Sequence, residues 1–128
     1  MNEPEIGLLL GQTATKISGA EKGSDEILFR LADGRTFKMF HGQDCCEQVD
    51  IEDIIGDVND LIGMPFTMAE EVTHQDETPD GVDPPEHPDS YTWTFYKLAT
   101  VKGYVTIRWL GESNGYYSES VDFVEVKS

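Results

Sequence analysis

Alternating apolar and polar positions run through most of the chain and predict β-strands. Residues 26–32 and 36–40 flank Asp33-Gly34, a pair typical of tight hairpin turns. Residues 91–100 and 103–110 are rich in aromatic and β-branched side chains, which predicts a second, longer hairpin. On the first of these, the alternation predicts that Tyr91, Trp93 and Phe95 face the core together. The expected strands cover residues 13–20, 26–32, 36–40, 65–72, 91–100, 103–110 and 117–126.

One segment has helical spacing instead. Between residues 51 and 62, apolar side chains recur three or four positions apart, acidic residues separate them, and Gly63 follows. This pattern predicts one short amphipathic helix. We therefore expect a single α+β domain over residues 1–128 that is β-rich, mainly an antiparallel sheet. Residues 73–90 are rich in proline and acids, which predicts a surface loop.

Two internal similarities suggest that the sheet is built from two degenerate three-strand units. Leu9-Leu10-Gly11 recurs as Leu61-Ile62-Gly63. Phe40-His41-Gly42 followed by Glu47 recurs as Trp109-Leu110-Gly111 followed by Glu119. Chance similarity between two β-rich halves is the alternative explanation. If the repeat is real, the loops after His41 and after Gly111 are equivalent.

The charge of the chain is strongly acidic and unevenly placed. It has 25 Asp and Glu against 9 Lys and Arg, a formal net charge of -16. Residues 39–96 contain no Lys or Arg, yet they hold more than half of the acids, all the histidines and both cysteines. Such a field repels nucleic acid and attracts basic surfaces or metal ions. Direct binding to nucleic acid is therefore not expected.

The apolar runs and the cysteines indicate a cellular compartment. No apolar run is long enough to cross a membrane, and the first residues lack the pattern of a signal peptide. The adjacent Cys45 and Cys46 are unsuited to a disulfide scaffold. We therefore expect a cytosolic protein with reduced thiols.

Three segments of the chain are distinctive: His41-Gly-Gln-Asp-Cys-Cys-Glu47, residues 91–100, and Trp109-Leu-Gly-Glu-Ser-Asn-Gly-Tyr-Tyr-Ser118. Together they resemble a family of small phage and prophage proteins of unknown function. The resemblance covers most of the chain after residue 8 and implies a viral context, with the host cytosol as the place of action. It implies no activity and no catalytic residues, but it draws attention to the loops at His41 and Gly111.

Acidic residues follow one another along the first of these segments, His41–Glu47, and the stretch after it. A row of carboxylates there would suit a host protein with a basic surface, and two tyrosines beside the second loop would suit an interface. The alternatives are that the charge only keeps the protein soluble and that the tyrosines pack across strands. The expected partner-binding residues are Asp44, Glu47, Asp50, Glu52, Asp53, Asp57, Asp60, Tyr116 and Tyr117.

A metal site is a weaker possibility. His41, Cys45 and Cys46 supply nitrogen and sulfur donors, which His74 or His87 could complete. Adjacent cysteines on a strand point to opposite faces, however, and a structural zinc site usually draws on separated pairs of ligands. Buried or loop-edge cysteines are the simpler interpretation. Residues 76–83 resemble the start of a calcium loop, but His87 stands where the bidentate Glu is required, which favours a solvated acidic loop.

A small-ligand site is the second alternative. Trp109 could stack on a base while Arg108, Lys97 or Lys102 meets a phosphate, as in a protein that sequesters a host nucleotide signal. The shortage of basic residues argues against this interpretation.

No nucleophile, base or phosphate-binding motif stands out, so we expect neither an enzyme nor a cofactor. The sequence favours a phage-encoded inhibitor that docks on a basic, nucleic-acid-binding surface of a host protein, for example a defence protein, by imitating nucleic acid. Exposed strand edges make a homodimer a reasonable expectation.

Overall fold

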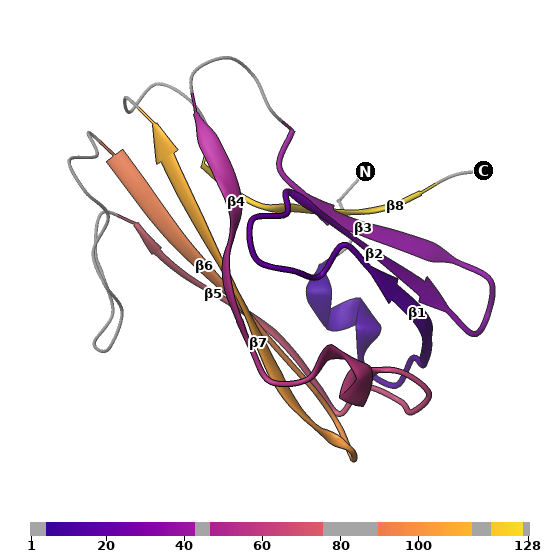
Figure 1. Ribbon diagram of the computed structural model, residues 1–128. Coiled ribbons are helices and arrows are strands. Elements are labelled where there is room, and N and C mark those ends of the chain that lie inside the picture. The colour runs from indigo at the N-terminus through magenta and orange to yellow at the C-terminus, as the bar shows by residue number, and fades with distance from the viewer. Residues whose placement is uncertain (1–4, 43–46, 76–89, 114–118, 127–128) are drawn as a thin grey trace.

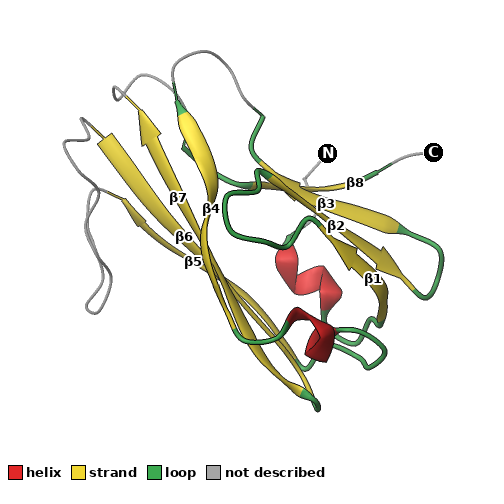
Figure 2. Ribbon diagram, in the orientation of Figure 1, coloured by secondary structure: helices red, strands yellow, loops and turns green. Residues whose placement is uncertain are grey.

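The computed structural model describes residues 5–42, 47–75, 90–113 and 119–126. Two antiparallel sheets of four strands face one another, with the 3-10 helix η1 (Ile6–Leu9) between them (Figure 1). Strands and 3-10 turns account for the regular structure of the described residues (Figure 2). The first sheet has the order β1 (Ala14–Ser18), β2 (Glu26–Leu31), β3 (Thr36–Phe40), β8 (Asp122–Glu125). The second has the order β4 (Gln48–Ile55), β7 (Gly103–Ser113), β6 (Ser90–Thr100), β5 (Met68–Gln75).

Alternate positions of both sheets form one apolar core. β2 and β3 bury every second side chain, and β7 buries Val105, Ile107 and Trp109 on its core face, with Thr106 also buried. Burial of this apolar area is the main driving force of folding. The largest fully buried side chains of the core cluster are Trp109, Tyr96, Phe29, Phe37, Leu9, Ile27, Leu31, Met39, Ile51, Leu61 and Leu98.

Both predicted hairpins are confirmed. Glu26 pairs with Phe40 across the turn at Asp33-Gly34, where Gly34 has φ +94°, and Ser90 pairs with Ser113 across the β6–β7 hairpin. The expected strand at 13–20 is β1, and the one at 65–72 is β5, which begins and ends three residues later. The expected strand at 117–126 is confirmed only as the shorter β8, and part of that range lies outside the described residues.

The predicted helix over residues 51–62 is wrong. Residues 48–55 form the edge strand β4, and only Val58–Leu61 makes a 3-10 turn, η2. The register of β4 on β7 shifts between Ile51 and Asp53, so Ile51 and Ile54 both pair with buried residues of β7. A β-bulge therefore produced a three-residue apolar spacing that imitates a helix. The protein is mainly β, and the α part of the expected α+β class is absent from the described residues.

The prediction that Tyr91, Trp93 and Phe95 of β6 face the core is also wrong. Thr94, Tyr96 and Leu98 are buried and lie on the core side. Trp93 is buried as well, but it lies outside the core cluster, on the same outer face as Phe95. The side chains of β6 do alternate between two faces. The sequence indicates the wrong face as the inner one, because large aromatic residues occupy the outer face.

The two halves of the chain exchange their last strands. β1–β2–β3 and β5–β6–β7 are each three-strand meanders; β4 then pairs with β7 of the other sheet, and β8 pairs with β3. The hydrogen bonds that precede the meanders repeat too: the Gly11 amide donates to the Phe66 carbonyl at 3.0 Å, and the Gly63 amide donates to the Ala14 carbonyl at 2.9 Å. Each sheet therefore consists of a three-strand meander from one half of the chain and a fourth strand from the other half.

Gly111 allows the second crossing segment to lie close to β7. A Cβ at this position would lie 2.7 Å from the Glu119 carbonyl oxygen and 3.1 Å from Val49 Cγ2. Backbone atoms cannot move aside as the end of a flexible side chain can. The crossing segment at Glu119 therefore requires a residue without a side chain beneath it.

Gly111→Ala is expected to lower the free energy of unfolding by about 1–3 kcal/mol, because the added methyl group overpacks the contact with Glu119. Denaturant unfolding measures the change. The matched control is Gly7→Ala, where a Cβ meets nothing within 4 Å. Equal losses in the two variants would contradict the close approach.

Candidate functional site

The described residues that flank the two loops singled out by the sequence meet where the chain crosses between the sheets. His41 follows β3 and Glu47 precedes β4, and their side chains are 3% and 1% exposed. The His41 Nε2 atom lies 2.8 Å from Glu47 Oε1, and Nδ1 lies 2.7 Å from the carbonyl oxygen of Ser120. His41 thus ties the first crossing segment to the second.

The partners of His41 define its protonation chemistry. A carbonyl oxygen only accepts, so Nδ1–H donates to Ser120. The contact between Nε2 and Glu47 then requires one further proton, held by the imidazole or by the carboxyl group. Both ring nitrogens are therefore engaged in the structure, which is the arrangement of a structural histidine.

Glu119 is the counterpart of Glu47 in the second crossing segment and is also buried. Thr92 Oγ1 donates to Glu119 Oε1 at 2.7 Å, and Ser113 Oγ donates to Oε2. Hydrogen bonds to both oxygens are what a buried carboxylate requires. The sequence similarity that aligned Glu47 with Glu119 therefore aligned two buried carboxylates with different partners.

The described residues contain no cluster of three or more His, Cys, Asp and Glu side chains placed to hold a metal ion. Cys45, Cys46 and His87 lie outside the described residues, as does the calcium-like segment 76–83. His74 lies on β5, with its ring 5.8 Å from that of Phe95. The structure does not bring His74 to His41.

Three of the predicted partner-binding acids lie on β4. Pairs of buried residues, Ile51 with Trp109 and Val49 with Gly111, alternate with pairs that face away from the core. Asp50, opposite Leu110, and Asp53, opposite Arg108, belong to this outer set, and Glu52 lies at the bulge between them. All three are half-buried.

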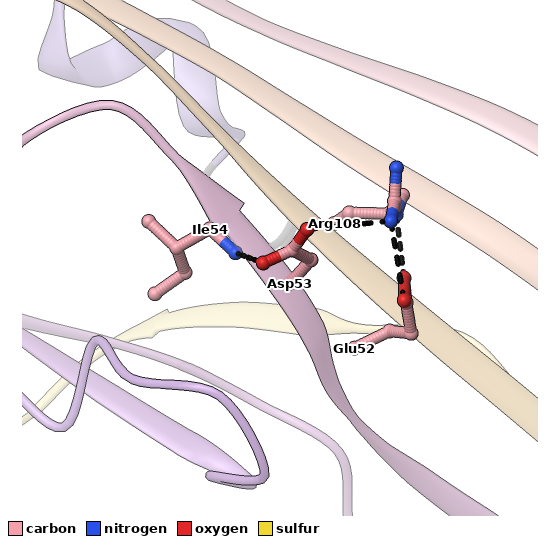
Figure 3. Close-up of polar contacts among 4 residues, drawn as sticks. All are labelled: Glu52, Asp53, Ile54 and Arg108. Atoms are coloured by element: carbon pink, nitrogen blue, oxygen red, sulfur yellow. Dashed lines mark hydrogen bonds and ion pairs between the residues drawn. The ribbon is translucent and has the colours of Figure 1, made fainter. Parts of the chain in front are cut away.

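Arg108 holds two of these carboxylates. Its Nε lies 2.6 Å from Glu52 Oε2 and one terminal nitrogen lies 3.1 Å from Glu52 Oε1, while Asp53 Oδ2 is 3.5 Å from that nitrogen (Figure 3). The guanidinium carbon also lies 5.7 Å from the centre of the Trp93 ring. A two-point Arg–carboxylate contact stacked on an aromatic ring fixes the orientation of Arg108.

The remaining acids on this side of the sheet have different surroundings. Glu112 of β7 pairs with Gln48 on the same outer face as Asp50. Partial burial raises the pKa of Glu112, and the negative charges of Asp50 and Glu119 raise it further. Beyond β4, exposed Asp57 caps η2 by accepting from the Asn59 amide at 2.9 Å, and Asp60 lies beside Gly103 of the β6–β7 turn.

We name the acidic edge by these residues: Asp50, Glu52, Asp53, Asp57, Asp60 and Glu112. Glu112 was not among the residues predicted from the sequence; its place opposite the edge strand is visible only in the register. Glu47 is buried beneath the surface and does not belong to the edge. Asp44, Tyr116 and Tyr117 lie outside the described residues.

The residues of the alternative ligand site are not assembled into one pocket. Trp109 is 0% exposed on the core face of β7, whereas Arg108 lies on the outer face. Lys97 pairs with Glu70 across β6 and β5, and the Lys102 ammonium donates to the Ile62 carbonyl at 2.8 Å at the β6–β7 turn.

The described residues include no helix with the length and apolar character needed to cross a membrane.

No curated protein and no solved structure matches the chain. A family model described as a domain of unknown function, DUF7448, matches residues 7–123. Among the described elements, the match runs from Gly7 in η1 through the strands to the buried Phe123 of β8. The chain therefore belongs to the DUF7448 family.

Proposed function

We propose that this protein is a non-catalytic, phage-encoded inhibitor that acts in the host cytosol and docks its acidic edge on a basic, nucleic-acid-binding surface of a host protein, such as a defence protein. The observation that carries the proposal is the position of the edge. β4 is a terminal strand of its sheet, and its acids, with Glu112 beside them, face away from the core. The phage context rests on the sequence resemblance described above.

The charges of the edge support a cationic partner. The net charge of -16 creates a long-range attraction for basic surfaces. At short range, Asp50 and Glu112 repel one another, so a guanidinium or ammonium group placed between them would replace repulsion with attraction. Arg108 already shows this geometry on the same face, since it is held by Glu52 and Asp53.

The two alternative functions have weaker support. A nucleotide site would need Trp109 and Arg108 on one side of the sheet, and they lie on opposite faces. A metal site at His41 would need one of its ring nitrogens to be released from Glu47 or Ser120. The expected homodimer stays a prediction.

Neutralising the acidic edge is expected to abolish partner binding. We would compare the wild type, the edge variant Asp50→Asn/Asp57→Asn/Glu112→Gln, and the control variant Glu21→Gln/Asp25→Asn/Glu26→Gln, which loses the same charge in and before β2. Asparagine preserves the cap at position 57. Each protein is immobilised, host extract is applied, and captured proteins are eluted with double-stranded DNA, identified, purified and measured individually by calorimetry.

The proposal predicts that captured partners are released by DNA, that their affinity for the wild type falls as salt rises, and that only the edge variant loses them. Equal binding by the edge and control variants would show that the edge is not the docking surface. Partners that DNA does not displace would contradict the imitation of nucleic acid.

Glu112→Gln is expected to raise the melting temperature at neutral pH. Because the pKa of Glu112 is raised in the folded protein, the folded state binds a proton more readily than the unfolded chain, so this group disfavours folding when ionised and ceases to do so as the pH falls through its folded pKa. The gain in the variant should therefore shrink at acidic pH. Thermal unfolding across this pH range, with Glu26→Gln as control, measures it, and a gain that does not depend on pH would refute the crowding of Asp50 and Glu112.

A further inference from the structure

The acidic edge continues into exposed apolar side chains at the end of the sheet where β6 turns into β7. Ile55 is 50% exposed at the end of β4, and Tyr104 is 48% exposed near the start of β7. Val101, in the turn between β6 and β7, is 72% exposed. We name these three residues the apolar patch. Large apolar side chains left this exposed beside one another are typical of interaction surfaces.

The strand register places the patch on the same outer face as the acidic edge. Val105 of β7 is buried in the core, so the side chains on either side of it, Tyr104 and Thr106, lie on the opposite face. Ile55 pairs with Thr106 and therefore shares that face. Ile55 and Tyr104 are thus diagonal neighbours across β4 and β7, a position from which long side chains reach one another.

Carboxylates border the apolar patch on the side of β4 and η2. Asp53 lies two residues before Ile55, and Asp57, which caps η2, lies two residues after it. The Asp60 carboxylate lies beside Gly103, where β7 begins. An apolar centre with a charged rim is the usual anatomy of a protein interface, and tyrosine is enriched among the residues that dominate its energy.

The apolar patch restricts what a basic partner can place on this end of the edge. A lysine or arginine head group pressed onto Ile55 would lose its hydration and gain no partner in return. Apolar surface is stabilised by burial against other apolar surface. The ammonium group of Lys102, in the same turn, donates to the Ile62 carbonyl. A partner that covers both the carboxylates and the patch must therefore carry apolar side chains among its cations.

We propose that the apolar patch belongs to the docking surface and selects a partner surface on which aromatic side chains lie between arginine or lysine residues. This inference rests on the proposed function of the acidic edge. The carboxylates attract any basic surface, since electrostatic attraction acts at long range and depends little on shape. The patch adds contact area that a purely charged surface cannot use, and so it separates the right partner from other basic proteins.

Two peptides of equal length and charge serve as probes: arginine alternating with tryptophan, and arginine alternating with serine. Calorimetry at fixed ionic strength measures their binding to the full chain. The patch variant Ile55→Thr/Tyr104→Thr removes the apolar contact, and threonine preserves the preference for a strand. The control variant Leu8→Thr/Val126→Thr removes apolar side chains that are 37% and 41% exposed, outside β4 and β7.

The wild type should bind the tryptophan peptide about tenfold more tightly than the serine peptide, because an aromatic ring buries apolar area on the patch. The patch variant should bind both peptides within about twofold of one another, and its affinity for the serine peptide should match that of the wild type. The control variant should keep the tenfold preference.

Equal binding of the two peptides by the wild type, which needs no variant, would overturn the inference. So would a preference that persists in the patch variant or that disappears equally in the control variant. The edge variant described above separates this failure from that of the proposed function. If it loses both peptides while the patch has no effect, the acidic edge stands without the patch; if it binds both as the wild type does, both proposals fail.

Discussion

The fold depends on the exchange of strands between its two sheets. β4 completes the sheet that contains β5, β6 and β7, and β8 completes the sheet that contains β1, β2 and β3. Neither three-strand meander can therefore form its full sheet without the other half of the chain. The two crossing segments must pass each other at close range, and the chain meets this requirement with the His41–Ser120 hydrogen bond and with Gly111 beneath Glu119. Buried Glu47 and Glu119 have hydrogen-bond partners there, so the crossing imposes no unpaired carboxylate on the core.

The exchange also decides which residues face solvent. Because β4 joins the second sheet as an edge strand, its acids face outward beside Glu112, and its apolar residues Val49 and Ile51 enter the core. At the opposite edge, β5 leaves an acidic cleft against the segment entering β8. Acidic side chains are thus placed at both edges of this sheet, on β4 and on β5. The motif residues His41, Glu47 and Gly111 lie where the chain crosses between the two sheets.

Local sequence signals predicted the strands better than the faces. The Asp33-Gly34 turn and the two hairpins were predictable because two-residue turns and alternating β-branched residues act over a few positions. The helix at 51–62 was wrong because a β-bulge imitates helical spacing, and β6 was inverted because its aromatic residues lie outside the core. The sequence did not predict the hydrogen bond between His41 and the Ser120 carbonyl group, because the two residues are far apart in the chain. Glu112 became recognisable only once the register placed it on the same face as Asp50.

The most direct test of the account is a map of backbone amide chemical shifts while a short arginine-rich peptide is added to the labelled protein. The account predicts that the largest changes follow β4 and η2 and include Glu112, with small changes in β1 and β2, even though β2 also carries the exposed Glu26. Changes spread evenly over acidic residues of both sheets, or centred on β1 and β2, would contradict the acidic edge as the docking surface and would reduce the charge to a solubilising role.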